Sequence, residues 1–137
     1  LLDLEPDQRA TVIQADLEDG SPWPLNEKFA GVVVVNYLHR PLTENLLESL
    51  EPGGLLIYET FARGNENFSR PRNPDHLLKS GELLQMVLGR LQVIAYEHGI
   101  RERSPLPGVI QRICAVNNLD QSVREDREPQ VLNLEPY

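Results

Sequence analysis

The sequence predicts an α/β fold in which a mostly parallel sheet carries helices on its faces, and three segments support this prediction. Residues 32–35 are four consecutive valines, a pattern typical of a parallel strand that is covered on both faces. Leucines then recur at helical spacing over residues 42–50, and residues 55–58 form a second short apolar run. Because parallel strands need a crossover connection, this order fits two parallel strands joined by a helix.

Four further segments complete the predicted α/β pattern. Residues 11–15 (TVIQA) contain β-branched residues and predict a first strand. Residues 81–88 predict a second helix, with Ser80 as its N-cap. The apolar segments 91–96 and 109–116 predict an antiparallel pair of strands at the edge of the sheet.

The composition bounds the class of protein. The 137 residues are 40% hydrophobic, which suffices for one domain with one core, expected over residues 1–117 before a polar tail at 118–137. The net charge of −8 disfavours nucleic acids and anionic membranes as partners. The single cysteine, Cys114, excludes an intramolecular disulfide, and we expect it in the core. No apolar run approaches the roughly 20 residues of a membrane span, so we expect a cytoplasmic protein. With a single cysteine, the chain is also expected to lack a metal site.

Polar residues follow the predicted strands where ligands bind in open α/β sheets, beyond the carboxyl ends of the strands. Asp16 and Leu17 follow the first predicted strand, whereas Asn36, Tyr37 and His39 follow the valine run. We expect them at one edge of the sheet, with Tyr37 and His39 as candidates for catalysis. Each also has an ordinary alternative. Asp16 can cap a turn and Asn36 can form one, while Tyr37 and His39 can be exposed loop residues.

The order of these features resembles one family. An Ala-Asp-Leu segment at residues 15–17, an apolar strand that ends at Asn36, a helix, and then Pro-Gly-Gly at residues 52–54 are similar to class I, Rossmann-like S-adenosylmethionine-dependent methyltransferases. The resemblance covers about residues 11–117. The branch that contains tellurite-resistance methyltransferases looks most similar, on the basis of residues 36–41 and 59–74.

The resemblance implies a cofactor and a partial site for it. In this family an acid at the position of Asp16 commonly accepts a hydrogen bond from the adenine amino group of S-adenosylmethionine. Leu17 and Asn36 would lie beside the same cofactor. The implied activity is methyl transfer to a small-molecule acceptor, in which the protein mainly positions the two reactants.

Two hallmarks of the family do not occur in these 137 residues, namely the glycine-rich G-x-G-x-G loop and the acid for the cofactor ribose. The chain begins with Leu1 and its only methionine is Met86, so we expect upstream sequence that completes the cofactor site. The alternative is a non-catalytic, oligomerising remnant that kept the sheet and lost this site. Another nucleotide-binding Rossmann protein, such as a dehydrogenase, is disfavoured by the position of the Pro-Gly-Gly segment.

A long loop is expected at residues 61–74, and it carries several cations in an acidic protein. Glu66 is its only acid. Because arginine forks suit carboxylates and phosphates, the loop is a candidate site for an anionic substrate; the alternative is a solvated loop with locally paired arginines. We expect Arg40, before the first helix, to pair with an acid on a nearby helix. The candidate substrate-binding residues are Arg63, Arg70 and Arg72.

The absence of the glycine-loop strand would leave the valine run at an apolar sheet edge. Unpaired backbone groups beside four valines form a template for another strand. Residues 11–15 could slide in beside residues 32–35, or two chains could pair about a two-fold axis. We favour the homodimer, because the slide alone would leave apolar surface exposed.

Overall fold

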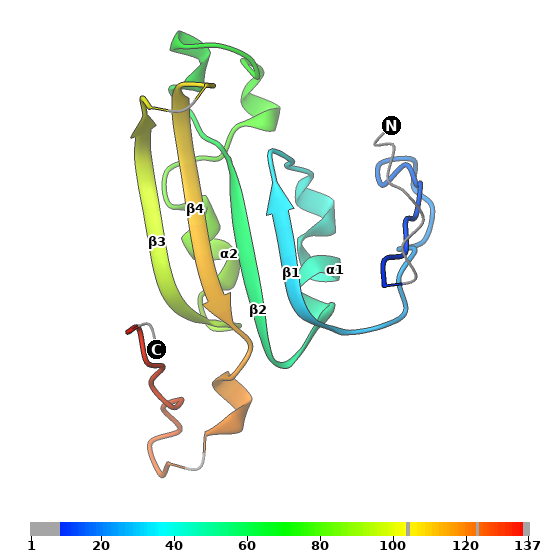
Figure 1. Ribbon diagram of the computed structural model, residues 1–137, viewed down its shortest axis with the longest axis vertical. Helices are drawn as coiled ribbons and strands as arrows, with labels where there is room; N and C mark the ends of the chain where they lie inside the picture. The colour runs from blue at the N-terminus through cyan, green and yellow to red at the C-terminus, as the bar shows by residue number, and fades with distance from the viewer. Residues whose placement is uncertain (1–8, 104, 123, 136–137) are drawn as a thin grey trace.

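The computed structural model describes residues 9–103, 105–122 and 124–135 of the chain. They form a mixed sheet in the order β1-β2-β4-β3, with β1 parallel to β2 and the other neighbours antiparallel (Figure 1). The α/β, Rossmann-like fold class and the antiparallel pair at one edge are confirmed. The strands are β1 (Phe29–Val35), β2 (Leu50–Phe61), β3 (Gln92–Arg101) and β4 (Gly108–Val116), and the α-helices are α1 (Thr43–Glu48) and α2 (Glu82–Val87).

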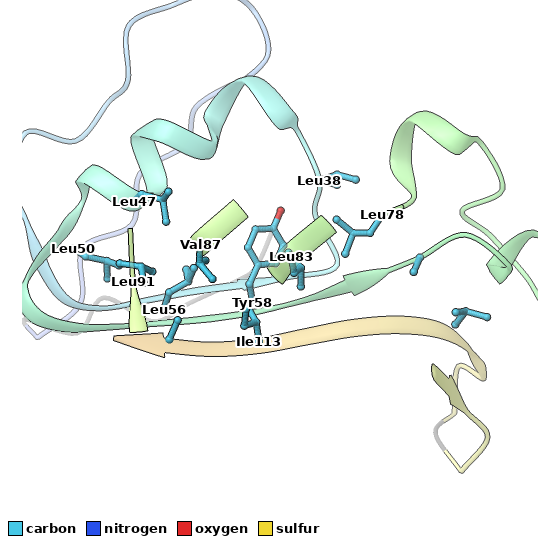
Figure 2. Close-up of a cluster of buried hydrophobic side chains, with 13 residues drawn as sticks. Leu38, Leu47, Leu50, Leu56, Tyr58, Leu78, Leu83, Val87, Leu91 and Ile113 are labelled. Carbon is cyan, nitrogen blue, oxygen red and sulfur yellow. The ribbon is translucent and has the colours of Figure 1, made fainter. Parts of the chain in front are cut away.

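Both helices pack on the same face of the sheet, and the hydrophobic core lies between them and the strands (Figure 2). Leu56 and Tyr58 of β2 are buried there because alternate residues of a strand point to the same face. Leu47 of α1, together with Leu83 and Val87 of α2, covers them. Full burial of a side chain of this size stabilises the fold by about 1.5–3 kcal/mol.

The opposite face of the sheet is open in the described part of the chain. Val33 and Val35 are 66% and 54% exposed, and Leu55 and Ile57 of β2 lie beside them. The expectation that the valine run is covered on both faces is therefore wrong for the described residues, because both helices pack on the other face. Cys114 pairs with Ile57 across the sheet and is only half-buried, so its expected place in the core is also wrong.

Residues 11–15 do not form a strand, which corrects the prediction of a first strand there. Val12 and Ile13 are 67% and 52% exposed. A sequence rich in β-branched residues needs a neighbouring strand and a surface to pack on before it can form a ladder. The segment lies beyond β1 and beside α1 instead (Figure 1), so β1 is an edge strand of the described sheet and residues 11–15 have not moved in beside it.

The predicted helix over residues 42–50 is shorter in the structure. Arg40–Leu42 form a 3-10 turn with Pro41 near its start, and α1 follows from Thr43. The Ser49 hydroxyl donates to the Asn45 carbonyl at 2.6 Å, and Leu50 already belongs to β2. Leu50 is 1% exposed, so this leucine is buried as the first residue of β2 and not as part of the apolar face of the helix.

Two glycines set the geometry around these elements. A Cβ atom at Gly54 would lie 2.9 Å from the Phe29 carbonyl oxygen, so the Pro-Gly-Gly segment permits the close approach of β1 and β2. Gly81, with φ of 74°, occupies the N-cap position of α2, which corrects the prediction of Ser80. The Glu82 carboxylate accepts the Lys79 backbone N–H at 2.8 Å and so satisfies a backbone donor ahead of the helix.

Candidate functional site

An apolar pocket of about 260 Å³ lies beside β1, between this strand, α1 and the segment that precedes β1. Leu17 and Trp23 come from that segment, so it closes a pocket although it forms no strand. Tyr37 and His39, just beyond the carboxyl end of β1, contribute polar groups to the lining. We call this hollow the β1 pocket; its lining includes Leu17, Trp23, Leu25, Phe29, Val34, Tyr37, His39, Leu42, Leu46 and Tyr58.

Tyr37 and His39 meet on one carboxylate, that of Glu18, at this pocket. The Tyr37 hydroxyl donates to Glu18 Oε2 at 3.0 Å. His39 Nδ1 lies 3.3 Å from Glu18 Oε1. Burial, reinforced by the hydrogen bond and the negative charge of Glu18, raises the pKa of Tyr37 to about 12. Tyr37 therefore keeps its proton at neutral pH and acts as a hydrogen-bond donor. We call Glu18, Tyr37 and His39 the polar cluster.

Tyr58 connects the polar cluster to the core. Its ring is 2% exposed among the core side chains, and its hydroxyl donates to the Tyr37 carbonyl at 2.7 Å. Burial raises the pKa of Tyr58 to about 12, so this donor also stays protonated. The backbone at Tyr37 is thus held by a residue that the hydrophobic packing fixes in place.

Asp16 and Leu17 lie at the same end of the sheet as the polar cluster. Asp16 Oδ1 accepts the Glu18 backbone N–H at 2.9 Å, which is the turn-capping role that the sequence left open. Two further hollows, of about 750 and 240 Å³, open beside Asp16 and Leu17. Tyr37 borders the larger of the two. Five candidates follow the predicted strands in the sequence. The structure brings four of them together, namely Asp16, Leu17, Tyr37 and His39.

The fifth candidate, Asn36, forms a turn. Its φ of 54° lies in the left-handed region, where asparagine is more readily accommodated than most residues. Its backbone N–H donates to the Glu59 carbonyl at 2.9 Å, which extends the contact between β1 and β2 by one residue. Asn36 directs the chain from β1 into the polar cluster, and its side chain lines neither the β1 pocket nor the two hollows beside Asp16.

Arg40 joins three parts of the chain, which confirms the predicted pairing with an acid on a nearby helix. Its Nε and Nη2 atoms donate to the two carboxylate oxygens of Glu82, in α2, at 2.8 and 3.0 Å. The guanidinium also donates to the carbonyls of Asp75 and Leu77, both at 3.0 Å. Burial opposes ionisation of Glu82, but the hydrogen bonds from Arg40 and the Lys79 backbone outweigh it and lower the pKa of Glu82.

The arginines of the loop after β2 are exposed and lie apart from the β1 pocket. Arg63 lies 3.4 Å from Glu66, whereas Arg70 and Arg72 form no ion pair within the described ranges. Asn65, which is fully buried, shapes this loop: its side chain donates to the Pro71 carbonyl at 3.0 Å and accepts the Val109 N–H at 3.1 Å. The loop is therefore an ordered structure that presents its arginines to solvent.

Two residues that organise these sites were not predicted from the sequence. Glu18 contacts side chains 19 and 21 residues away, and a local pattern does not encode such contacts. Nothing in the sequence distinguishes Asn65, which is buried, from the other polar residues of its loop. Within the described ranges, no group of three His, Cys, Asp or Glu side chains is placed to hold a metal ion, and no helix is long and apolar enough to cross a membrane.

Comparison with solved structures identifies the fold. The chain is similar to TehB from Haemophilus influenzae, with 13% identity and a TM-score of 0.55 over 68% of this chain and 37% of TehB. It is also similar to the N-methyltransferase NodS from Bradyrhizobium japonicum WM9, with 16% identity and a TM-score of 0.53 over 70% of this chain and 55% of NodS. A second structure of NodS, in complex with S-adenosyl-L-homocysteine, matches with a TM-score of 0.50 and 15% identity, over 70% of this chain and 50% of that one.

These likenesses show that the described sheet and helices have the fold of a Rossmann-like methyltransferase. The chain spans about one third to one half of the length of these structures. No protein-family model and no curated protein matches the sequence. The specific resemblance to the tellurite-resistance branch stays a prediction.

Proposed function

We propose that this chain is part of an S-adenosylmethionine-dependent methyltransferase that acts on a small molecule. The observation that carries the proposal is the convergence of Asp16, Leu17, Tyr37 and His39 at the carboxyl edge of a methyltransferase-like sheet, where ligands bind in open α/β folds. The β1 pocket beside them is apolar and closed on one side by Trp23. Such a pocket can exclude water from two reactants and hold them in line.

The residues of this chain fit one end of the cofactor. Asp16 is exposed beside a hollow, and within the described ranges its Oδ2 atom has no hydrogen-bond partner, so it can accept from an adenine amino group. Leu17 offers an apolar surface for the adenine ring at the same place. When bound, S-adenosylmethionine supplies an already activated methyl group. The ribose and methionine portions need the glycine-rich loop and the ribose acid, so we propose that residues outside these 137 supply them.

A pair of calorimetric titrations tests this proposal. S-adenosylmethionine should bind the 137-residue chain weakly or not at all, and a micromolar dissociation constant would contradict the predicted lack of its main contacts. A chain extended at its N-terminus by its natural upstream sequence should bind it. In that longer form, Asp16→Ala should weaken binding by about 1.5–3 kcal/mol, roughly ten- to a hundredfold, the cost of losing a hydrogen bond to a charged acceptor. Asp75→Ala, on the loop after β2, is the matched control.

The loop after β2 supports a proposal for the methyl acceptor. Arg63, Arg70 and Arg72 are exposed on one ordered loop, and among the described residues Glu66 pairs with Arg63 alone. We propose that the loop attracts an anionic group of the acceptor. Alanine substitution of the three arginines should raise the acceptor's Michaelis constant in an active form and leave cofactor affinity unchanged. If the triple variant keeps the wild-type Michaelis constant for the acceptor, the loop is solvated surface and not a binding site.

The alternative function is a non-catalytic homodimer built on the same fold. The exposed valines and the open outer edge of β1 favour it, because an apolar edge strand readily pairs with another chain. In that case the extended chain would still fail to bind S-adenosylmethionine. The titration of the extended chain therefore separates the two functions.

A further inference from the structure

Glu18 has no role in the function proposed above, yet it organises the polar cluster. Its two carboxylate oxygens serve different partners. Oε2 accepts the Tyr37 hydroxyl at 3.0 Å, while Oε1 lies 3.3 Å from His39 Nδ1. The side chains of His39 and Glu18 are 26% and 50% exposed, so the pair lies at the rim of the β1 pocket rather than in the core. A carboxylate beside one nitrogen of an imidazole determines which nitrogen carries the proton.

We infer that Glu18 is a positioning residue that keeps His39 in the Nδ1–H form, which leaves Nε2 free to accept a proton from the methyl acceptor. This inference rests on the proposed methyltransferase function. Among the described residues, Nε2 has no hydrogen-bond partner, and His39 lines the pocket in which the acceptor would lie. The proton of the acceptor atom moves to Nε2, its bonding electrons stay on that atom, and the resulting imidazolium faces the Glu18 carboxylate.

The neighbours of His39 are suited to this role. Tyr37, with its pKa of about 12, stays protonated and donates to Glu18, so it does not compete for the acceptor's proton. Tyr58 holds the Tyr37 backbone from the core, which limits the movement of the cluster. A base at this position is useful only when the nucleophilic atom carries a proton at neutral pH. We therefore infer that the nucleophilic group of the acceptor is an amine or a hydroxyl that still carries its proton, separate from the anionic group that the arginine loop would attract.

The test determines the tautomer of His39 in the 137-residue chain by long-range ¹H–¹⁵N correlation spectroscopy at a pH where the ring is neutral. His39 should be predominantly Nδ1–H. Glu18→Leu, which removes the carboxylate and keeps apolar bulk, should shift it to the Nε2–H form that exposed imidazoles prefer. Glu18→Gln, which retains an acceptor oxygen, should preserve the Nδ1–H form. Tyr37→Phe should also preserve it, because Tyr37 contacts the other carboxylate oxygen.

A second readout measures the reactivity of Nε2. Diethyl pyrocarbonate acylates neutral imidazole nitrogens, and mass spectrometry follows each histidine separately. Glu18→Leu should slow the modification of His39 several-fold. His76 and His98 are exposed and form no ion pair within the described ranges, so they are internal controls for the amount and reactivity of the reagent.

The outcomes separate this inference from the proposed function. An Nε2–H tautomer in the wild-type chain, or equal tautomers in the wild type and Glu18→Leu, overturns the positioning role whatever the cofactor titration gives. An Nδ1–H tautomer that depends on Glu18, with no cofactor binding by the extended chain, supports the positioning of His39 and refutes the methyltransferase assignment. A Glu18→Leu chain that loses its dispersed amide spectrum has unfolded, and Glu18→Ala at this half-exposed position then takes its place, with the same expected shift to the Nε2–H form.

Discussion

Removal of the Arg40 guanidinium should destabilise the fold more than removal of the more exposed Arg90 guanidinium. Arg40 makes two hydrogen bonds to Glu82 and one each to the carbonyls of Asp75 and Leu77. Hydrogen bonds to charged groups are worth about 1.5–3 kcal/mol each when protected from solvent. The Arg40 side chain is 39% exposed and Glu82 is 19% exposed, so solvent screening reduces this value. We expect Arg40→Met to cost about 2 kcal/mol, because it leaves Glu82 partly buried and unpaired.

Urea unfolding at pH 7, followed by circular dichroism, measures this cost. Arg90→Met is the matched control, because Arg90 pairs with Glu44 through similar hydrogen bonds but the side chains are 44% and 64% exposed. An exposed pair of this kind contributes about 0–1 kcal/mol. Equal destabilisation by the two substitutions would refute the reasoning that partial burial and the two carbonyl contacts distinguish Arg40.

The pH dependence gives a second check on the same ion pair. The folded state lowers the pKa of Glu82 below its usual 4.5, so the stabilisation is present above that value and is lost as the pH falls through the lower folded pKa. The difference in stability between wild type and Arg40→Met should therefore narrow as the pH falls below about 4.5. A constant difference across that range would show that Glu82 is not the partner that matters.

Two further predictions concern packing and assembly. Gly108→Ala should cost about 2–3 kcal/mol in urea unfolding, because the added methyl group would overlap Asn65 Oδ1, whereas Gly99→Ala, which meets open space, should change stability by less than about 0.5 kcal/mol. The wild-type chain should self-associate at high micromolar concentration in light scattering, and Val33→Lys with Val35→Lys should make it monomeric, since both valines lie on the open face beside an edge that no described strand pairs with. A monomeric wild type would contradict the second prediction.

The sequence predicted the elements whose apolar residues form a strong local pattern. The valine run lies in β1, the segment 55–58 lies in β2, and the two late apolar runs pair as β3 and β4. The pattern was ambiguous at Leu50, because a buried leucine fits the end of an amphipathic helix and the start of a strand equally well. The prediction that the helix extends to Leu50 was therefore wrong, although Leu50 is buried as an apolar residue of a predicted element should be.

The remaining errors arise from contacts between distant residues. Residues 11–15 have the composition of a strand, but a strand forms only where a neighbour offers unpaired backbone groups and a surface. The sequence predicted that Arg40 would find an acid on a helix, but not that the acid would be Glu82, 42 residues away. Glu18 was missed for the same reason, since its contacts with Tyr37 and His39, 19 and 21 residues away, exist only in the folded chain.

Several unusual features of the fold have one common physical cause, the absence of a neighbour beside β1 in the described chain. The outer edge of β1 lacks a strand, Val33 and Val35 are exposed, and residues 11–15 have nothing to pair with. We propose that an added strand beside β1, with a helix on the open face, would cover this edge and these valines, and that a glycine-rich loop at the end of that strand would lie next to the polar cluster. A second copy of the chain would cover the edge but supply no such loop. If the added neighbour is the chain's own upstream segment, extension should abolish self-association and create cofactor binding together. If it is a second copy, extension should change neither.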